Sequence, residues 1–152
     1  MSYARFGWMI LTSTLVMFGL MYLNTYAASH LWFSETRAYM ALIMGASMAA
    51  VMLGFMLKHY PKPRVNLAIL AGAVLAFASS LWLVRSQSTV EDISWMKAMI
   101  PHHSIAILTS ERATLRDPRV RQLADDIIAT QRREIDEMEA LIRDLEANDG
   151  SD

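Results

Sequence analysis

The sequence has no cysteine among its 152 residues. Disulfide bonds, thiolate nucleophiles and thiolate metal sites are therefore excluded. Acidic residues are also nearly missing from the first half, where residues 1–85 contain six Lys or Arg and a single Glu. Residues 86–152 have the opposite balance, with eight Lys or Arg against fourteen acids. Because this segment is so acidic, no nucleic-acid partner is expected.

Charged side chains are absent from three long apolar runs, residues 7–23, 38–57 and 65–84. Each run is close to the roughly 20 residues that a helix needs to cross the hydrocarbon core of a bilayer. The alternatives are buried helices of a soluble bundle and, for the first run, a cleaved signal peptide, but this run is longer than a typical signal core. The sequence therefore predicts an all-α protein with a three-helix transmembrane domain in residues 1–85.

The positive residues predict how these helices cross the membrane. Lys58, Lys62 and Arg64 lie in the short loop between the second and third runs, and loops of this kind stay on the cytoplasmic side. Two spans separate Arg5 from this loop, so the N-terminus is expected on the same side. The loop before the second span and everything after residue 84 then lie on the opposite face. In the inner (cytoplasmic) membrane of a bacterium, that face is the periplasm or the cell exterior.

Residues 86–152 are expected to form an exported antiparallel helical hairpin. An apolar pattern with helical spacing begins at Thr89, and Thr89 with Asp92 resembles a capping box. Asp117 is suited to cap a second helix and Pro118 to occupy its first position, and this helix continues to about residue 146. Such a hairpin cannot bury its apolar faces alone. A homodimer or higher homo-oligomer that completes a four-helix bundle is favoured, although another partner protein or the membrane spans are alternatives.

The first helix of this hairpin contains the stretch "WMKAMIPHH", with two methionines and two adjacent histidines around Pro101. Side chains three and four residues apart share a helix face, so methionine, histidine and acid side chains recur on one stripe. A turn near residues 116 and 117 would place part of the second helix opposite this stripe, with Glu134 facing Met99. The predicted site comprises Met96, Met99, His102, His103, Glu134 and Met138, supported by Asp92 and Gln131.

Thioether and imidazole groups together, without cysteine, favour Cu(I), while imidazole and carboxylate also admit Cu(II) or Zn(II). The sequence thus predicts a metal-binding protein, with copper as the favoured ligand, on the exported side. The alternative is a non-enzymatic assembly or docking module, in which methionines fill the core and the His, Glu and Gln side chains form a buried polar network. A ferritin-type oxidase is not favoured, because the sequence contains no Glu-x-x-His spacing.

Three further residues are weaker candidates for metal binding. His30 lies in the exported loop and would extend the site if the hairpin folded onto that loop. Met44 and Met48 belong to a series of methionines at every fourth residue of the second span, from Met40 to Met56. This series is interpreted either as a row of thioethers that conducts copper or, preferably, as packing and lipid-facing side chains.

The stretches "WMKAMIPHHSIAI" and "ATQRREIDEMEALI" resemble the family called domain of unknown function 305, whose pattern matches residues 90–146. The resemblance implies a ferritin-like helical fold, and some members are linked to copper binding or tolerance. It also implies that the predicted ligands and Gln131 are signature positions. Soluble members often contain two hairpins, whereas this chain has one, which strengthens the expectation of a dimer. The three spans resemble the membrane-bound members, and copper-handling or other membrane proteins are possible partners.

Overall fold

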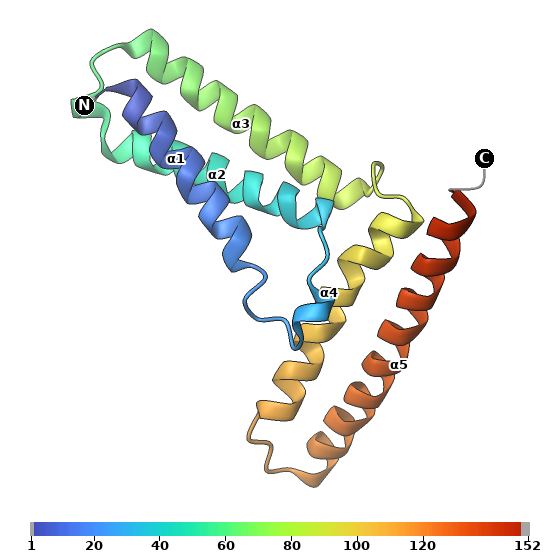
Figure 1. Cartoon of the computed structure of the whole chain (residues 1–152). Helices are drawn as coiled ribbons and strands as arrows, with labels where there is room; N and C mark the ends of the chain where they lie inside the picture. The colour runs from blue at the N-terminus through green and yellow to red at the C-terminus, as the bar shows by residue number, and fades with distance from the viewer. Residues whose placement is uncertain (1, 150–152) are drawn as a thin grey trace. The chain divides into compact units, whose positions relative to one another are not determined.

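The computed structural model describes residues 2–149, and all regular structure within them is helical (Figure 1). This confirms the predicted all-α class. The chain order is α1 (Tyr3–Leu20), η1 (Ala28–His30), α2 (Glu35–Phe55), η2 (Leu57–His59), α3 (Pro63–Ser86), α4 (Asp92–Arg112) and α5 (Pro118–Asp149), where η marks a 3-10 helix.

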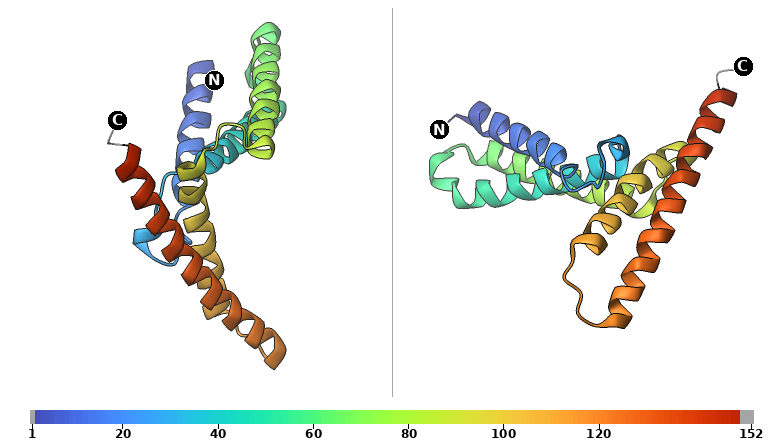
Figure 2. Two further views of the ribbon diagram at one scale, coloured as in Figure 1. Left: turned by 90° about the vertical axis from the view of Figure 1, so that its right-hand side faces the viewer. Right: turned by 60° about the horizontal axis from the view of Figure 1, so that its bottom comes forward.

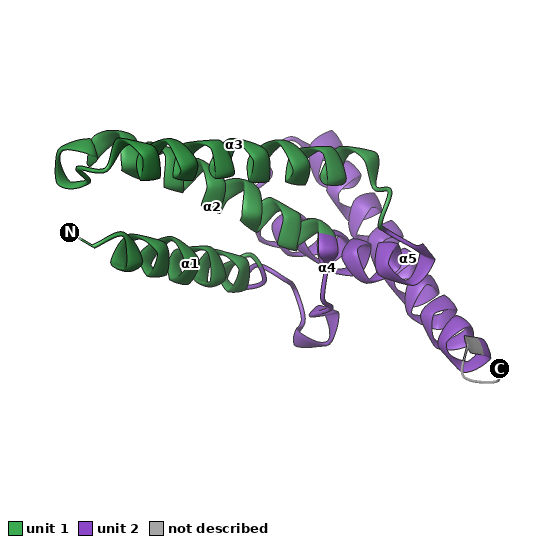
Figure 3. Cartoon of the chain, turned by 90° about the horizontal axis from the view of Figure 1, so that it is seen from above, with its two compact units in different colours: residues 1–21, 36–89 green, residues 22–35, 90–152 purple. Residues whose placement is uncertain are grey.

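The chain divides into two compact units (Figure 3). Unit 1 consists of Met1–Met21 and Thr36–Thr89, and unit 2 of Tyr22–Glu35 and Val90–Asp152. The sequence division at residue 85 therefore lies within a few residues of the second boundary. Residues 22–35, which the sequence division assigned to the membrane domain, instead belong to the compact unit that contains the hairpin.

The helices of unit 1 are long and apolar enough to cross a membrane. They contain 18, 21 and 24 residues, with mean hydropathies of 1.2, 1.8 and 2.3 in their most apolar windows. Protein buries only 6%, 22% and 11% of these windows, so most of their apolar surface needs another cover, which lipid would supply. The three predicted spans each agree with one helix to within four residues at either end.

Aromatic packing joins the helices of unit 1 near η2. Phe6, Leu53 and Tyr60 form a buried cluster, and the Phe6 and Tyr60 rings meet edge to face with centroids 5.4 Å apart. Met52 and Met56, two members of the methionine series, pack against this cluster. For these two methionines, packing therefore accounts for the side chain without a bound metal.

In unit 2, α4 and α5 form an antiparallel hairpin, and the two views of Figure 2 show α5 returning alongside α4. Asp117 caps α5 as predicted, because its Oδ1 accepts a hydrogen bond from the Arg119 backbone N–H at 2.9 Å. The Arg119 side chain also donates to this carboxylate, which lowers the pKa of Asp117 below its ordinary value.

The predicted capping box at the start of α4 is wrong. The helix begins at Asp92, with Glu91 at the N-cap position and no side-chain hydrogen bond that caps it. Thr89 lies in unit 1, where its hydroxyl is 2.9 Å from the hydroxyl of Tyr39. The pattern of residue types alone did not reveal this competing partner, which is distant in the sequence.

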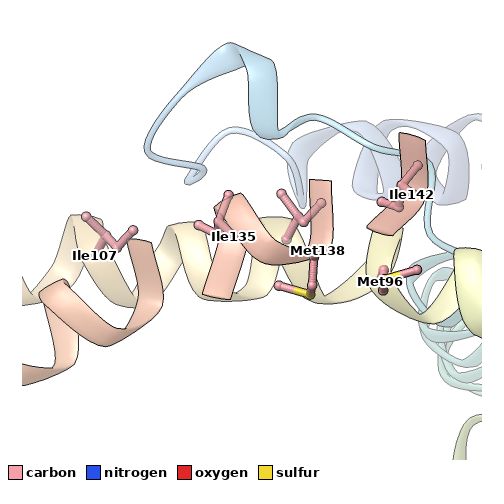
Figure 4. Close-up of a cluster of buried hydrophobic side chains, with 6 residues drawn as sticks. Met96, Ile107, Ile135, Met138 and Ile142 are labelled. Atoms are coloured by element: carbon pink, nitrogen blue, oxygen red, sulfur yellow. The ribbon is translucent and has the colours of Figure 1, made fainter. Parts of the chain in front are cut away.

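The core of unit 2 lies between α4 and α5. Figure 4 shows isoleucine and methionine side chains from the two helices directed into the space between them. The buried members are Met96, Ile100, Ile107, Ile135, Met138 and Ile142. Trp32, from the loop that precedes α2, also packs against this cluster. The hairpin therefore covers part of its apolar surface with its own chain, a partner that the sequence-based argument for a dimer did not include.

Ser104 of α4 contacts residues 22–35, the first segment of unit 2, through its hydroxyl group. Its side chain is fully buried, and its Oγ accepts a hydrogen bond from the Tyr26 backbone N–H at 2.6 Å. The same oxygen lies 2.9 Å from Nδ1 of His30. His30 thus meets the hairpin, as its candidate role required, but it does so through a serine hydroxyl.

Ser104→Ala is expected to loosen residues 22–35 without unfolding the hairpin, because the Tyr26 N–H loses its acceptor. Loss of one such partner costs about 1 kcal/mol, which corresponds to about fivefold faster exchange of the Tyr26 amide hydrogen. Hydrogen exchange measured by mass spectrometry would detect this change. Ser110→Ala, on the same helix, is the control, and equal exchange rates in the two variants would contradict the assigned contact.

Candidate metal-binding site

A cleft of about 330 Å³ opens between α4 and α5. Its α4 wall is a stripe at four-residue spacing, Trp95, Met99 and His103, with Met96 beside it. The α5 wall follows the same periodicity. It consists of Glu134, Glu137, Met138 and Leu141. Regular helical spacing on both walls thus brings three thioethers, one imidazole and two carboxylates to a single cleft.

The solvent exposure of the side chains that line the cleft increases from its base to its rim. Met96 and Met138 belong to the hydrophobic core and are only 5% and 7% exposed. Met99 and His103 are partly buried, whereas Trp95 and Leu141 are half exposed. The polarisable sulfur atoms of Met96 and Met138 therefore sit where little water competes with them.

His103 is held at both ring nitrogens. Nδ1 is 2.9 Å from the Met99 carbonyl oxygen, and Nε2 is 2.9 Å from Oε2 of Glu134. A carbonyl oxygen and an ionised carboxylate can only accept hydrogen bonds. Both contacts are satisfied when the ring carries two N–H groups, or when Glu134 carries the second proton. The Glu134 contact fixes the direction of the ring edge that lines the cleft.

His102 and His103 have different surroundings although they are adjacent. The His102 side chain is exposed, and its ring centroid is 6.1 Å from that of His103. Successive helical residues differ by about 100° in direction, so only one of the pair can face α5. His102 is not among the residues that line the cleft.

The structure brings together five of the predicted site residues and places the others elsewhere. Met96, Met99, His103, Glu134 and Met138 line the cleft. Asp92 lines a separate depression beside Glu91, and Gln131 is partly buried outside the cleft lining. His30 lines another pocket, with Tyr26 and Arg132, and Met44 and Met48 are partly buried in unit 1.

The predicted facing of the two helices is wrong by about one helical turn. The prediction placed Glu134 opposite Met99, whereas the structure pairs Glu134 with His103, one turn further along α4. The loop between α4 and α5, residues 113–117, does not explain this shift, because a turn centred earlier in the chain would place a residue before Met99, and not after it, opposite Glu134. A second pair across the hairpin joins Arg132 of α5 to Glu111 of α4.

Three cleft residues were missed by the sequence analysis: Trp95, Glu137 and Leu141. Their signal was present, since Trp95 lies four residues before Met99 and Glu137 three residues after Glu134. Within residues 2–149, no three side chains of the His, Cys, Asp or Glu type meet as a metal-binding group. The donor set of the cleft is instead dominated by thioethers.

Residues 85–151 match the family described as Domain of unknown function (DUF305). The chain is also 34% identical over 106 residues to a protein named Uncharacterized protein L153, from Acanthamoeba polyphaga mimivirus. This alignment covers 68% of each of the two chains. The chain belongs to the DUF305 family.

The DUF305 match contains both cleft-forming helices, α4 and α5. The similarity to the viral protein extends further, because its 106 residues exceed the 68 that follow residue 84 in this chain. It therefore includes part of the segment that forms the apolar helices of unit 1. No solved structure matches the chain.

Proposed function

We propose that this DUF305 protein is a membrane-anchored copper-binding protein that holds Cu(I) in the cleft between α4 and α5. The observation that carries the proposal is the convergence of Met96, Met99, Met138 and His103 on one cleft. Neutral thioethers with an imidazole form a soft donor set, which suits Cu(I) better than the harder divalent ions. Glu134 supplies negative charge beside this set, and the Met99 carbonyl oxygen orients the His103 ring through Nδ1, which leaves Nε2 as the donor.

The donor positions fit a bound ion in two respects. Met96 and Met138 come from different helices and both reach the buried base of the cleft, so one ion can be held between them. His103 would bind Cu(I) through Nε2 only after that nitrogen has lost its proton. The Glu134 carboxylate, which lies 2.9 Å from Nε2, would then be close to the positive charge of the bound ion. Cu(II) and Zn(II) are less suited, because they prefer imidazole and carboxylate donors over thioethers.

The proposed location is the cytoplasmic membrane of a bacterium, with the N-terminus inside and unit 2 on the extracytoplasmic face. The Lys- and Arg-rich connection between α2 and α3 supports this orientation. The packing of residues 22–35 with the hairpin supports it too, because both segments must lie on one side of a membrane crossed by α1, α2 and α3. Thioethers suit this compartment, since they do not form disulfides. Buffering, tolerance or delivery of copper is the corresponding role, and no catalytic step is proposed.

The test is elemental analysis of the purified full-length chain after loading with Cu(I) under reducing conditions and dialysis. About one copper ion per chain is expected, because the soft donors of unit 2 form a single cleft. The double variant Met44→Leu plus Met48→Leu is the matched control, and it should retain the same stoichiometry. Copper at the level of a buffer blank would refute the proposal. Loss of bound copper in the control variant would indicate that the site lies on α2.

The His103–Glu134 contact favours a second candidate function, a structural or assembly module. In that case the pair fixes how the hairpin docks onto a second copy or onto a membrane complex, and no metal is involved. Measuring particle size and copper content on one preparation separates the two functions. The assembly function expects an oligomer without copper, in which Glu134→Gln disrupts the oligomer. The copper function expects bound metal whatever the size.

A further inference from the structure

Trp95 stands at the exposed rim of the cleft that contains the thioethers. It begins the stripe that continues through Met99 and His103 at four-residue intervals, so its indole extends along the same wall as these donors. The side chain is 50% exposed, so part of its surface faces the cleft and part faces solvent. Its place at the rim suits it to cover an ion bound below.

The face of an aromatic ring attracts a cation, and tryptophan does so most strongly. A Cu(I) ion held by neutral thioethers keeps its positive charge, apart from the influence of Glu134. An indole over such an ion would stabilise that charge and exclude water from the open side of the cleft. Aliphatic side chains at the rim, such as Leu141, provide the second effect only.

Trp32, the other tryptophan in unit 2, provides an internal comparison. The Nζ atom of Lys97 lies 5.2 Å from its ring centroid, so a protein cation already occupies this ring's neighbourhood. Trp32 packs on the core cluster and is not among the residues that line the cleft. The two indoles in the same unit are thus distinguished by their environment, and only Trp95 is placed to meet a cation that enters the cleft.

We infer that Trp95 forms the aromatic cover of the metal site and raises its affinity for a soft monovalent cation. This inference rests on the proposed copper-binding function. The cover adds about threefold to thirtyfold to the affinity for such a cation, the range of a single cation–π contact.

The experiment uses Ag(I), a soft monovalent ion that does not change its oxidation state on mixing with the protein. The full-length chain in detergent is titrated with Ag(I), while bound silver is measured by equilibrium dialysis and tryptophan emission by fluorescence. The wild-type chain should bind about one silver ion and lose part of its emission at the same silver concentration. Trp95→Leu should bind about threefold to thirtyfold more weakly, and Trp95→Phe should fall between the two.

Trp32→Phe is the matched control, and it should keep both the affinity and the loss of emission. In Trp95→Phe, the remaining tryptophans should show little response to silver. If Trp95→Leu binds silver as tightly as the wild-type chain, or if the emission change persists in Trp95→Phe, the inference is overturned while the metal site stands. If the wild-type chain binds no silver and no copper, the proposed function itself fails.

Discussion

His103→Ala is expected to lower the affinity for Cu(I) by more than about a hundredfold, whereas His102→Ala lowers it by less than about threefold. Loss of a residue that only supports a metal ligand already costs roughly 10- to 100-fold, and His103 is proposed as a ligand itself. His102 is exposed and outside the cleft, where substitutions have small effects. Competition with a chromophoric Cu(I) chelator measures both affinities on the purified chain.

The two variants form a matched pair, because each removes one imidazole from adjacent positions of the same helix. They differ only in whether that imidazole lines the cleft. Overall helicity and particle size should be unchanged in both variants, since neither ring belongs to the buried core cluster. An equal loss in the two variants would indicate a site on the surface of α4 instead of in the cleft. If His103→Ala binds Cu(I) as tightly as the wild-type chain, the imidazole is not one of the metal ligands.

The apolar helices of unit 1 were predictable because their signal is local. A helix must be about 20 residues long and free of charge to cross a bilayer, and both properties can be counted directly in the sequence. The start of α5 was predictable for a similar reason, since Asp117 and Pro118 act within one turn of their own position. The capping box at Thr89 failed because its hydroxyl has a partner fifty residues away.

The chemistry of the site was more predictable than its geometry. Helical spacing groups Met96, Met99 and His103 whatever the partner helix does. The pairing of α5 with α4 is not set by the position of the five-residue loop alone, because the loop is centred before the assumed turn while His103 pairs with a residue after the predicted one. The role of residues 22–35 could not be predicted from periodicity, because it depends on a hydrogen bond between the Ser104 hydroxyl and the backbone N–H of Tyr26, which is far away in the chain.

Met96 and Met138 reconcile two interpretations that the sequence left as alternatives. Methionine in a helix interface usually fills space, and these two residues do fill the core between α4 and α5 (Figure 4). They also line the cleft, so the same side chains can stabilise the hairpin and offer sulfur to an ion. Burial of a methionine is therefore no argument against its being a ligand. The relevant observation is whether the cleft reaches the side chain.

The double variant Met96→Leu plus Met138→Leu separates these two roles. Leucine has nearly the volume of methionine but no sulfur, and such exchanges cost less than about 1.5 kcal/mol each in most cores. We expect the helical hairpin to persist, with only a small change in its thermal unfolding. The affinity for Cu(I) is expected to fall by more than about a hundredfold, because two donors are lost from the buried base of the cleft.

Chelator competition and thermal unfolding monitored by circular dichroism measure the two effects on one sample. Met40→Leu plus Met56→Leu, which changes the same residue types in unit 1, is the matched control and should alter neither copper affinity nor the unfolding of the hairpin. If the Met96 and Met138 variant unfolds at the wild-type temperature and still binds copper tightly, the thioethers are core residues only. If it loses copper while the fold persists, the sulfur atoms themselves hold the ion, since volume and burial are retained and only the donor atoms have been removed.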